Sequence, residues 1–473
     1  MRLLKPAFLS LLFGQLWGGL LWASELTEHE QLALEIFKEL IETDTTHSTG
    51  DTGIAAQKMA DRLLQAGFPE EDVSVLINAP RKGNLVARLR SPKPTREPVL
   101  FLAHIDVVEA NPEDWSFDPF TFREQQDHFY GRGTLDDKDE AAIHIANLIW
   151  MKQQGFQPNR DIIVVLTADE EGGPENGVRY LLAEHPDLIN AAFVINEGGG
   201  GSILDGRHVT NSVQTAEKVY QSYTLEVINP GGHSSRPRKD NAIYQLAHAL
   251  TRVEQIQFPF GLNETTRAMF AASIANMPAD VAQAIPGLLQ DPPDEESIAF
   301  MEEDYGALFR TTCVATQLDA GHAENALPQR AKATVNCRVL PGSSVEEVEK
   351  TLAKAINDQD VTITPVQQAT LSDPSPLKEN IMSPIHQISE EMWPGVVVVP
   401  SMSTGATDGL FFRNAGIPVY GVSGIFYAVG ENRAHGKDER ILKKSFFDGL
   451  EFLYRLTKAY SSPQDEAAST TRL

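Results

Sequence analysis

Residues 99–108 read Val-Leu-Phe-Leu-Ala-His-Ile-Asp-Val-Val, an almost unbroken apolar run that carries one histidine and one aspartate. Such a run is typical of a strand with both faces buried, as in a parallel sheet covered by helices on both sides. Similar runs at 162–167 and 191–195 each follow a segment with helical periodicity, at 139–153 and 178–184. This alternation of strands and helices predicts an α/β domain built on a mostly parallel sheet.

The order of elements changes near residue 218, where a second unit interrupts the α/β domain. The pattern predicts a strand at 219–228, a helix at 242–253, two strands flanking Asn325, a helix at 345–356 and a strand at 361–366. This order is that of a ferredoxin-like α+β unit, here with a long insertion before the second strand. We therefore expect a catalytic domain in two parts, 24–215 and 371–460, a lid domain at 216–370 and a disordered tail at 461–473.

The amino-terminal 23 residues predict export. Arg2 and Lys5 precede an apolar run that ends near Ala23, which is typical of a secretory signal peptide. An uncleaved membrane anchor is the alternative, because the run approaches the minimum length of a membrane span. No later segment is apolar enough to cross a membrane, so the mature protein is expected to be periplasmic or secreted and not bound to a membrane.

The charge and the cysteine content further restrict the class of protein. The formal net charge is -25 and no block rich in Lys and Arg occurs, so nucleic acid is not expected as a partner. The two cysteines, Cys313 and Cys337, flank the hairpin predicted near Asn325. They could form a disulfide in an exported protein or simply be two small buried residues.

Five polar segments stand at predicted strand ends or in glycine-rich turns, where open α/β sheets place their sites. They are His104-Ile105-Asp106, the stretches 131–138, 167–173 and 196–200, and 432–436. The stretch 167–173 places three adjacent carboxylates, Asp169, Glu170 and Glu171, after a buried strand, which is costly unless a cation neutralises them. Histidines and carboxylates without cysteine favour zinc, with manganese or cobalt as alternatives.

These motifs resemble the dinuclear zinc exopeptidase family that contains glutamate carboxypeptidase, carboxypeptidase S, carnosinase, aminoacylase and succinyl-diaminopimelate desuccinylase. The resemblance rests on Leu-Ala-His-Ile-Asp-Val-Val at 102–108, Tyr-Gly-Arg-Gly-Thr-Leu-Asp-Asp-Lys at 130–138 and Thr-Ala-Asp-Glu-Glu-Gly-Gly at 167–173. It covers nearly the whole mature chain, and the long insertion in the lid is most similar to the carboxypeptidase S branch. One departure is Asn196-Glu197, where some relatives carry Asp-Glu.

The resemblance implies two Zn²⁺ ions per chain, for which Co²⁺ or Mn²⁺ could substitute. The implied ligands are His104, Asp136, Glu171, Glu197 and His435. Asp136 would bridge the ions, Glu171 would share one with His435, and Glu197 would share the other with His104. Asp106 would orient His104, Glu170 would be the general base, and the Asp136-Asp137 peptide bond would be cis.

The resemblance also implies which residues act on the substrate, and most of them lie in the lid. His233 would stabilise the oxyanion by reaching a neighbouring active site, which implies a possible homodimer. Asn325 and Arg338 would contact the substrate, and the backbone N–H groups near Gly405 would receive its carboxylate. A bidentate guanidinium such as that of Arg338 suits a planar carboxylate.

The sequence therefore predicts a metallocarboxypeptidase that cleaves the amide bond next to a free carboxylate in dipeptides or short peptides. An N-acyl amino acid deacylase, with the same chemistry and another acyl pocket, is the nearest alternative. A non-catalytic binding domain on this fold is a remote one, since the base and all the proposed ligands are present.

Overall fold

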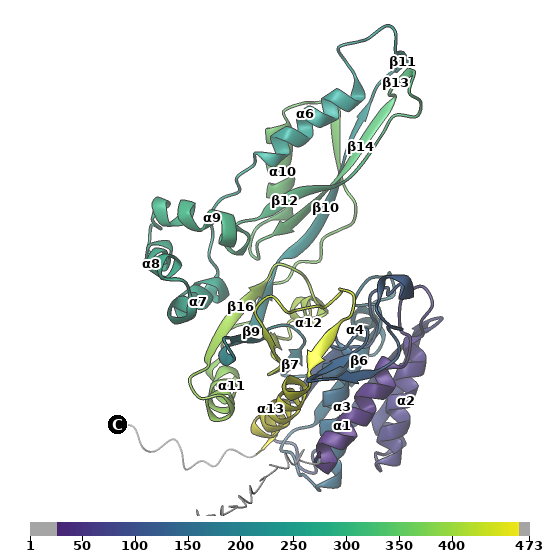
Figure 1. Ribbon diagram of the computed structural model, residues 1–473, viewed down its shortest axis with the longest axis vertical. Helices are drawn as coiled ribbons and strands as arrows, with labels where there is room; N and C mark the ends of the chain where they lie inside the picture. Colours follow the sequence, from purple (N-terminus) through teal and green to yellow (C-terminus); the bar gives the residue numbers. More distant parts are fainter. Residues whose placement is uncertain (1–25, 463–473) are drawn as a thin grey trace, which may run out of the picture.

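The computed structural model describes residues 26–462 and divides them between a broad catalytic domain and an elongated lid (Figure 1). The predicted signal peptide and most of the predicted tail lie outside the described residues. Among residues 26–462, no helix has the length and hydropathy needed to cross a membrane.

The catalytic domain is built on a ten-stranded mixed sheet of order β1-β2-β6-β3-β7-β17-β9-β8-β18, with β16 also paired to β9. Its central strands β6, β3, β7 and β17 are parallel to one another. Its strands are β1 (Val73–Ala79), β2 (Lys82–Leu89), β3 (Val99–His104), β6 (Ile162–Thr167), β7 (Phe193–Asn196), β8 (Gly200–Leu204), β9 (Arg207–Glu217), β16 (Val397–Ser403), β17 (Val419–Gly421) and β18 (Phe426–Ala428). The predicted mostly parallel α/β sheet is confirmed.

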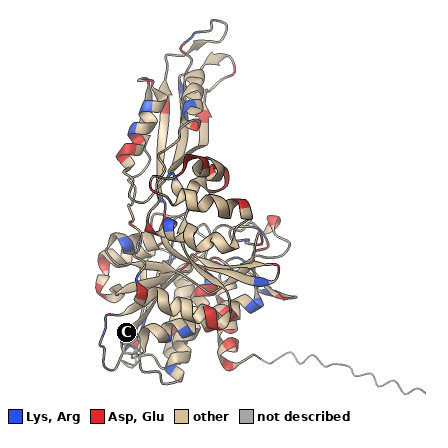
Figure 2. Cartoon of the chain, turned by 90° about the vertical axis from the view of Figure 1, so that its left-hand side faces the viewer, with Lys and Arg blue, Asp and Glu red and all other residues tan. Residues whose placement is uncertain are grey.

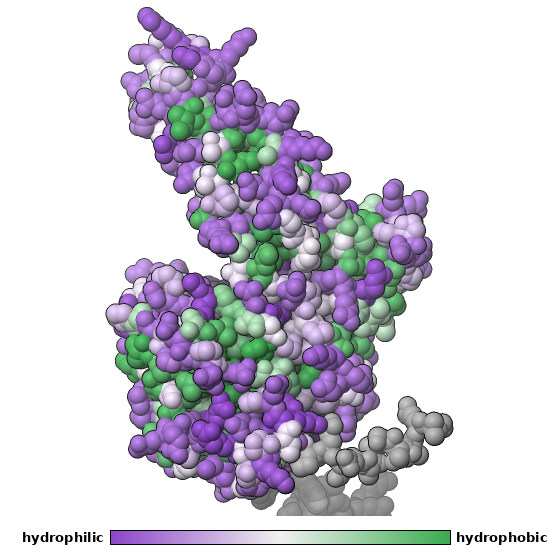
Figure 3. Space-filling view, turned by 180° about the vertical axis from the view of Figure 1, so that it is seen from behind, coloured by the Kyte–Doolittle hydropathy of each residue, from purple (hydrophilic) through white to green (hydrophobic). Residues whose placement is uncertain are grey.

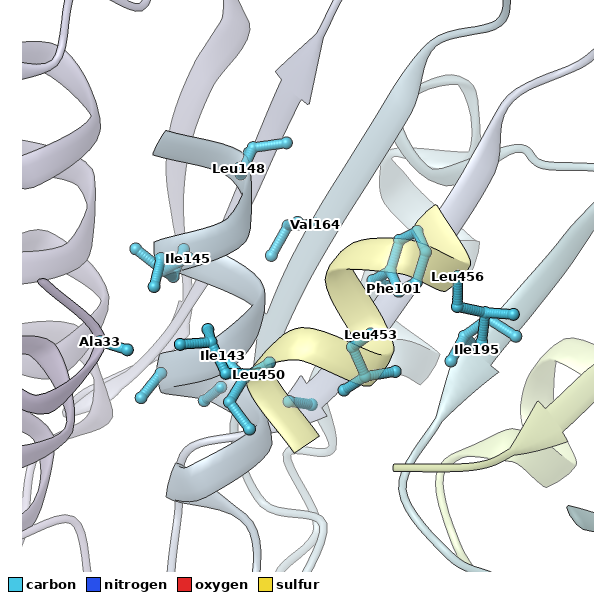
Figure 4. Close-up of a cluster of buried hydrophobic side chains, with 14 of the residues drawn as sticks. Ala33, Phe101, Ile143, Ile145, Leu148, Val164, Ile195, Leu450, Leu453 and Leu456 are labelled. Carbon is cyan, nitrogen blue, oxygen red and sulfur yellow. The ribbon is translucent and has the colours of Figure 1, made fainter. Parts of the chain in front are cut away.

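Helices cover both faces of this sheet, as the apolar strands require. The helices are α1 (Glu28–Ile41), α2 (Thr52–Gln65), α3 (Lys138–Gln153), α4 (Gly177–Glu184), α5 (Pro186–Ile189), α11 (Glu379–Met392), α12 (Gly409–Asn414) and α13 (Lys443–Ser461). Phe101 packs with side chains of α3 and α13 on one face (Figure 4). Leu100 and Leu102 pack with residues of α4 and α12 on the other, because successive side chains of a strand alternate between its faces.

The lid is a four-stranded antiparallel sheet of order β12-β14-β10-β15 with two helices, which confirms the ferredoxin-like unit. Its elements are β10 (Val219–Ile228), α6 (Ala242–Glu254), β12 (Thr312–Ala320), β14 (Arg330–Val339), α10 (Val345–Ile356) and β15 (Val361–Pro365). A two-stranded sheet of β11 (Gly232–His233) and β13 (Ala326–Leu327) forms its far tip (Figure 1). Cys313 and Cys337 face each other across β12 and β14 and form a disulfide.

The insertion forms three helices with a small core of their own: α7 (Glu264–Ser273), α8 (Ala279–Leu288) and α9 (Glu295–Phe309). Helix α7 packs against β16, and Leu308 joins Ala216, Leu340 and Met402 in a separate cluster where the lid meets the catalytic domain. The space-filling view shows the hollow between these two parts of the molecule (Figure 3). Acidic residues occur along the helices of both parts (Figure 2).

Candidate metal centre

Asp136 lies between two histidines at the carboxyl ends of the parallel strands. Its Oδ1 is 2.9 Å from Nε2 of His104, and its Oδ2 is 3.0 Å from Nε2 of His435. His104 ends β3, Asp136 precedes α3, and His435 comes from a loop late in the chain. Two ligand atoms that are each about 2 Å from one zinc ion lie roughly 3 Å apart. One carboxylate could thus bind metal ions at two neighbouring positions, and a histidine nitrogen is available as a further ligand at each of them.

Two glutamates complete the two metal positions, and a third lies beside them. Oε1 of Glu171 is 3.0 Å from Nε2 of His435, and Oε2 of Glu197 is 3.9 Å from Nε2 of His104. Within the described chain, donor atoms of His104, Asp136 and Glu171 lie within 4.8 Å of one another, as do those of His104, Glu170 and Glu197. The structure therefore brings together all five residues for which the sequence implied a ligand role, with the proposed base beside them.

Asp106 acts on this site differently from the sequence expectation, which placed it beside His104 on one strand face. Strand β3 ends at His104, and just beyond it the N–H of Ile105 donates to the carbonyl of Thr167 on β6. The backbone carbonyl of Asp106 lies 3.0 Å from Nδ1 of His104, whereas the nearer carboxylate oxygen is 3.7 Å away. The Asp106 carboxylate instead accepts hydrogen bonds from the N–H groups of Glu170 and Glu171.

The electrostatics of the centre fit a pair of cations. Burial raises the pKa of Glu197 to about 8, and burial together with Glu197 raises the pKa of Glu170 well above its usual range. Burial also opposes ionisation of Asp136, but hydrogen bonds from His104 and His435 hold its pKa below the usual range. Carboxylates this close and this buried keep their charges together only when positive charge opposes them. Nitrogen and oxygen donors without sulfur match zinc, manganese or cobalt.

A buried ion pair fixes the loop that carries Asp136. Glu439 accepts hydrogen bonds from the guanidinium of Arg132 and from the backbone N–H groups of Gly133 and Leu135. The Asp136-Asp137 peptide bond is cis, as expected from the resemblance. Glu439 could not be predicted from the sequence, because nothing in its local pattern indicates a contact with a loop so distant in the chain.

The lid residues fall into two groups. His233 and Asn325 lie together at the far tip, where the N–H of Ser234 donates to the carbonyl of Asn325, and His233 is exposed. Strands β11 and β13, which hold this tip together, are distant from the strands that carry the metal centre (Figure 1). Within one chain, the structure therefore does not bring His233 or Asn325 to the centre.

Arg338 lies at the opposite end of the lid, where β14 meets the catalytic domain. Its guanidinium stacks over the ring of Tyr220 at 4.7 Å and donates to Asn336. Beside it lies Lys218, which is 1% exposed and whose ammonium donates to the hydroxyl of Thr312 at 3.3 Å. Burial, and then the nearby Arg338, lower the pKa of Lys218 to about 8.

Lys218 was missed in the sequence analysis, although it marks the passage from β9 to β10. No carboxylate of the described residues forms an ion pair with Lys218 or Arg338, and the adjacent Glu217 pairs with Arg413 instead. The loop after β16 lies close by, since the N–H of Lys218 donates to the carbonyl of Ser403. In that loop the N–H of Gly405 donates to the hydroxyl of Ser403.

Residues 100–459 match the sequence family described as peptidase family M20/M25/M40. The chain belongs to this family. The resemblance recognised in the sequence is thereby confirmed, including its carboxypeptidase S branch. Since the M20 family consists of metallopeptidases and related hydrolases, the protein is an enzyme of that class.

Two curated M20 relatives differ in the substrates that their names imply. The N-fatty-acyl-amino acid synthase/hydrolase PM20D1 of Xenopus tropicalis is 30% identical over 452 residues, covering 92% of this chain and 87% of the relative. The probable carboxypeptidase S-like 2 of Dictyostelium discoideum is 28% identical over 409 residues, covering 84% and 78%. Both peptide and N-acyl amino acid hydrolysis are therefore consistent with the M20 relatives.

Solved structures of M20 proteins share the fold. The metallo-carboxypeptidase Sso-CP2 of Sulfolobus solfataricus has a TM-score of 0.68 at 17% identity, covering 92% of this chain and 99% of that one. YXEP of Bacillus subtilis, described as a dinuclear metal binding peptidase, has a TM-score of 0.57 at 11% identity, covering 90% and 97%. These likenesses support the arrangement of a catalytic domain interrupted by a second domain.

Proposed function

We propose that this chain is an exported two-zinc hydrolase that cleaves the amide bond next to a free C-terminal carboxylate. The observation that carries the proposal is Asp136, whose two oxygens each face a different histidine. Two metal ions held by His104, Asp136, Glu171, Glu197 and His435 would supply a water of lowered pKa and positive charge at the carbonyl oxygen. The residues of the chain would supply the proton transfers and the orientation of the substrate.

Glu170 is placed for the proton transfers. The backbone N–H of Glu170 donates to the carboxylate of Asp106, which fixes its position beside His104 and Glu197. As general base, Glu170 accepts a proton from the attacking water and then delivers it to the departing amine.

Lys218 and Arg338 would bind the substrate carboxylate. They are two neighbouring cations that have no carboxylate partner among the described residues, and Lys218 is fully buried. A buried charge without a counterion is costly, and an arriving carboxylate would remove that cost. Such a subsite would restrict the enzyme to substrates that end in a free carboxylate.

We further propose that the tip of the lid serves the active site of a second subunit. His233 and Asn325 are adjacent to each other and exposed, and they lie far from the metal ligands of their own chain (Figure 1). A two-fold arrangement would let each subunit complete the other. Export is supported by the apolar amino terminus and by the Cys313–Cys337 disulfide, which suits an oxidising compartment.

Dipeptides and short peptides remain the first substrate class, and the PM20D1 relatives favour N-acyl amino acids as the second. The experiment is hydrolysis by the zinc-loaded protein of N-acetyl-leucine, phenylalanyl-leucine and the α-amides of both. We expect the free acids to be cleaved and the amides to be poor substrates. Equal cleavage of acid and amide would contradict the carboxylate requirement, and no cleavage by protein with two bound zinc ions would contradict the hydrolase.

A further inference from the structure

Two cavities adjoin at the metal centre. The first has a volume of about 150 Å³, and its wall includes Asp136 and Glu197 together with the glycine turn that follows β7. The second has a volume of about 170 Å³ and is lined by residues of β18 and of two further strands, β5 (His128–Tyr130) and β19 (Arg440–Leu442). Leu135 and Tyr427 line both cavities, so the second cavity adjoins the one at the ligands.

The two cavities differ in chemistry. Acidic groups are numerous around the first, where Asp137, Asp139 and Glu140 join the two ligand carboxylates. The second is lined mainly by apolar side chains: Leu135, Phe426, Tyr427, Ala428, Ile441 and Leu442.

The polar groups on the second cavity already have partners within the protein. Arg440 pairs with Glu431 and donates to the hydroxyl of Tyr130, and His128 lies 3.2 Å from Asp127. The second cavity therefore presents a largely apolar surface to a guest.

We infer that the second cavity holds an apolar group of about six carbons on the acyl side of the scissile amide. This inference rests on the proposed function, because that function sets the direction of the substrate. The carboxylate end contacts Lys218 and Arg338 at the base of the lid, and the carbonyl lies at the metal ligands. The acyl part is then left to the catalytic domain, where this apolar cavity shares the wall residues Leu135 and Tyr427 with the ligand cavity.

The volume sets the size of the guest. An apolar protein cavity of about 150 Å³ binds benzene, a six-carbon guest, and the second cavity is slightly larger. The guest is either a straight acyl chain or the side chain of the residue before the cleaved bond, since both have the same apolar chemistry. Acetyl-sized groups would end in the first cavity and leave the second unfilled.

The test compares N-acyl-leucines with acetyl, butyryl, hexanoyl, octanoyl and hexadecanoyl groups. Burying one methylene is worth roughly a fourfold gain in affinity, so four methylenes from acetyl to hexanoyl predict a gain on the order of 10²-fold in kcat/KM. The gain should stop between about eight and ten carbons, when the cavity is full. Phenylalanyl-leucine against alanyl-leucine is the parallel peptide arm, and a gain in one arm alone identifies the source of the guest.

Two variants change the volume of the second cavity in opposite directions. Ala428→Phe should fill it, lowering kcat/KM for hexanoyl-leucine at least tenfold while changing acetyl-leucine less than threefold. Leu442→Ala should enlarge it and shift the preferred chain by about two carbons. The control is Val429→Phe, which adds a ring of the same kind at the next residue, whose side chain is 67% exposed; the length profile should stay that of the wild type.

Binding to the zinc-loaded Glu170→Gln variant separates this inference from the proposed function. Affinities of acetyl- and hexanoyl-leucine for that variant report on the cavity even when no substrate is turned over. Hydrolysis of acetyl-leucine without any gain from longer chains would overturn the acyl cavity and leave the hydrolase intact. Equal losses for acetyl and hexanoyl substrates in Ala428→Phe, with Leu442→Ala unchanged from wild type, would overturn it as well.

Discussion

Replacing Lys218 by methionine should make the protein more stable and weaken its binding of free-acid substrates. Lys218 is fully buried, and burial together with Arg338 lowers its pKa from 10.5 to about 8. A tenfold change in proton affinity is worth about 1.4 kcal/mol, so the charged ammonium costs the fold about 3 kcal/mol at pH 7. The variant also loses the hydrogen bond to Thr312, which costs it about 1 kcal/mol of stability. The expected net gain in stability for Lys218→Met is therefore about 2 kcal/mol.

The sign of the pH dependence follows from which state holds the proton. Below pH 8 both the folded and the unfolded protein hold it, so the full cost is present. Between pH 8 and 10.5 the folded protein releases the proton while the unfolded chain retains it, so the stability contributed by this residue rises with pH. The advantage of Lys218→Met should therefore shrink by about 2 kcal/mol between pH 7 and pH 9.5.

Urea unfolding followed by far-ultraviolet circular dichroism measures both quantities at fixed zinc concentration. The matched control is Lys354→Met on the exposed face of α10, which should change stability by less than about 0.5 kcal/mol at either pH. In activity assays, Lys218→Met should raise KM for the free acid at least tenfold and leave the α-amide unaffected. A variant that is less stable than wild type at pH 7, or whose advantage does not change with pH, would refute the reasoning.

Three further predictions address the base, the lid tip and the disulfide. Glu170→Ala should keep about two zinc ions by metal analysis while losing about 10²–10⁴-fold in kcat; an empty metal position would instead make Glu170 a ligand. His233→Ala should lower kcat by about 10²–10³-fold, and co-expression with Glu170→Ala should restore part of the activity through mixed dimers, unless His233 serves only its own chain. Replacing Cys313 and Cys337 by alanine opens a loop with a sequence separation of 24 and should cost about 3 kcal/mol in lid stability, measurable as a lower unfolding midpoint that reductant no longer affects.

Segments with strong periodicity were predicted closely from the sequence. Strand 219–228 and helix 345–356 have the bounds expected for them, because their apolar side chains follow one period throughout. The strand expected at 99–108 was too long, since β3 ends at His104. Ile105 and Val107 are buried beyond that end, so their apolar character reflects packing of the segment after the strand and could not be distinguished from a longer strand.

Contacts between distant residues were the harder part of the site. Sequence spacing placed Asp106 beside His104, and its backbone carbonyl does lie 3.0 Å from Nδ1 of that histidine. The hydrogen bonds that its carboxylate accepts from the N–H groups of Glu170 and Glu171 were not predicted. The choice between these partners depends on how two neighbouring strand ends pack, which no local pattern encodes. Glu439 is comparable, because a single glutamate near the end of the chain is unremarkable until it meets Arg132.

The burial of the charged side chain of Lys218 indicates how the site binds its substrate, and it could not be predicted from the sequence. A lysine between two strands ordinarily extends to solvent, and the sequence offers no reason to expect otherwise. The fold buries it beside Arg338 and gives the neighbouring Glu217 to Arg413, so the charge that would balance it must come from outside the described residues. The same reasoning applies to the metal ligands with the charges reversed. Their clustered carboxylates require cations, whereas Lys218 and Arg338 require a carboxylate. A substrate that ends in a carboxylate and places its carbonyl at the metal centre would satisfy both demands at once.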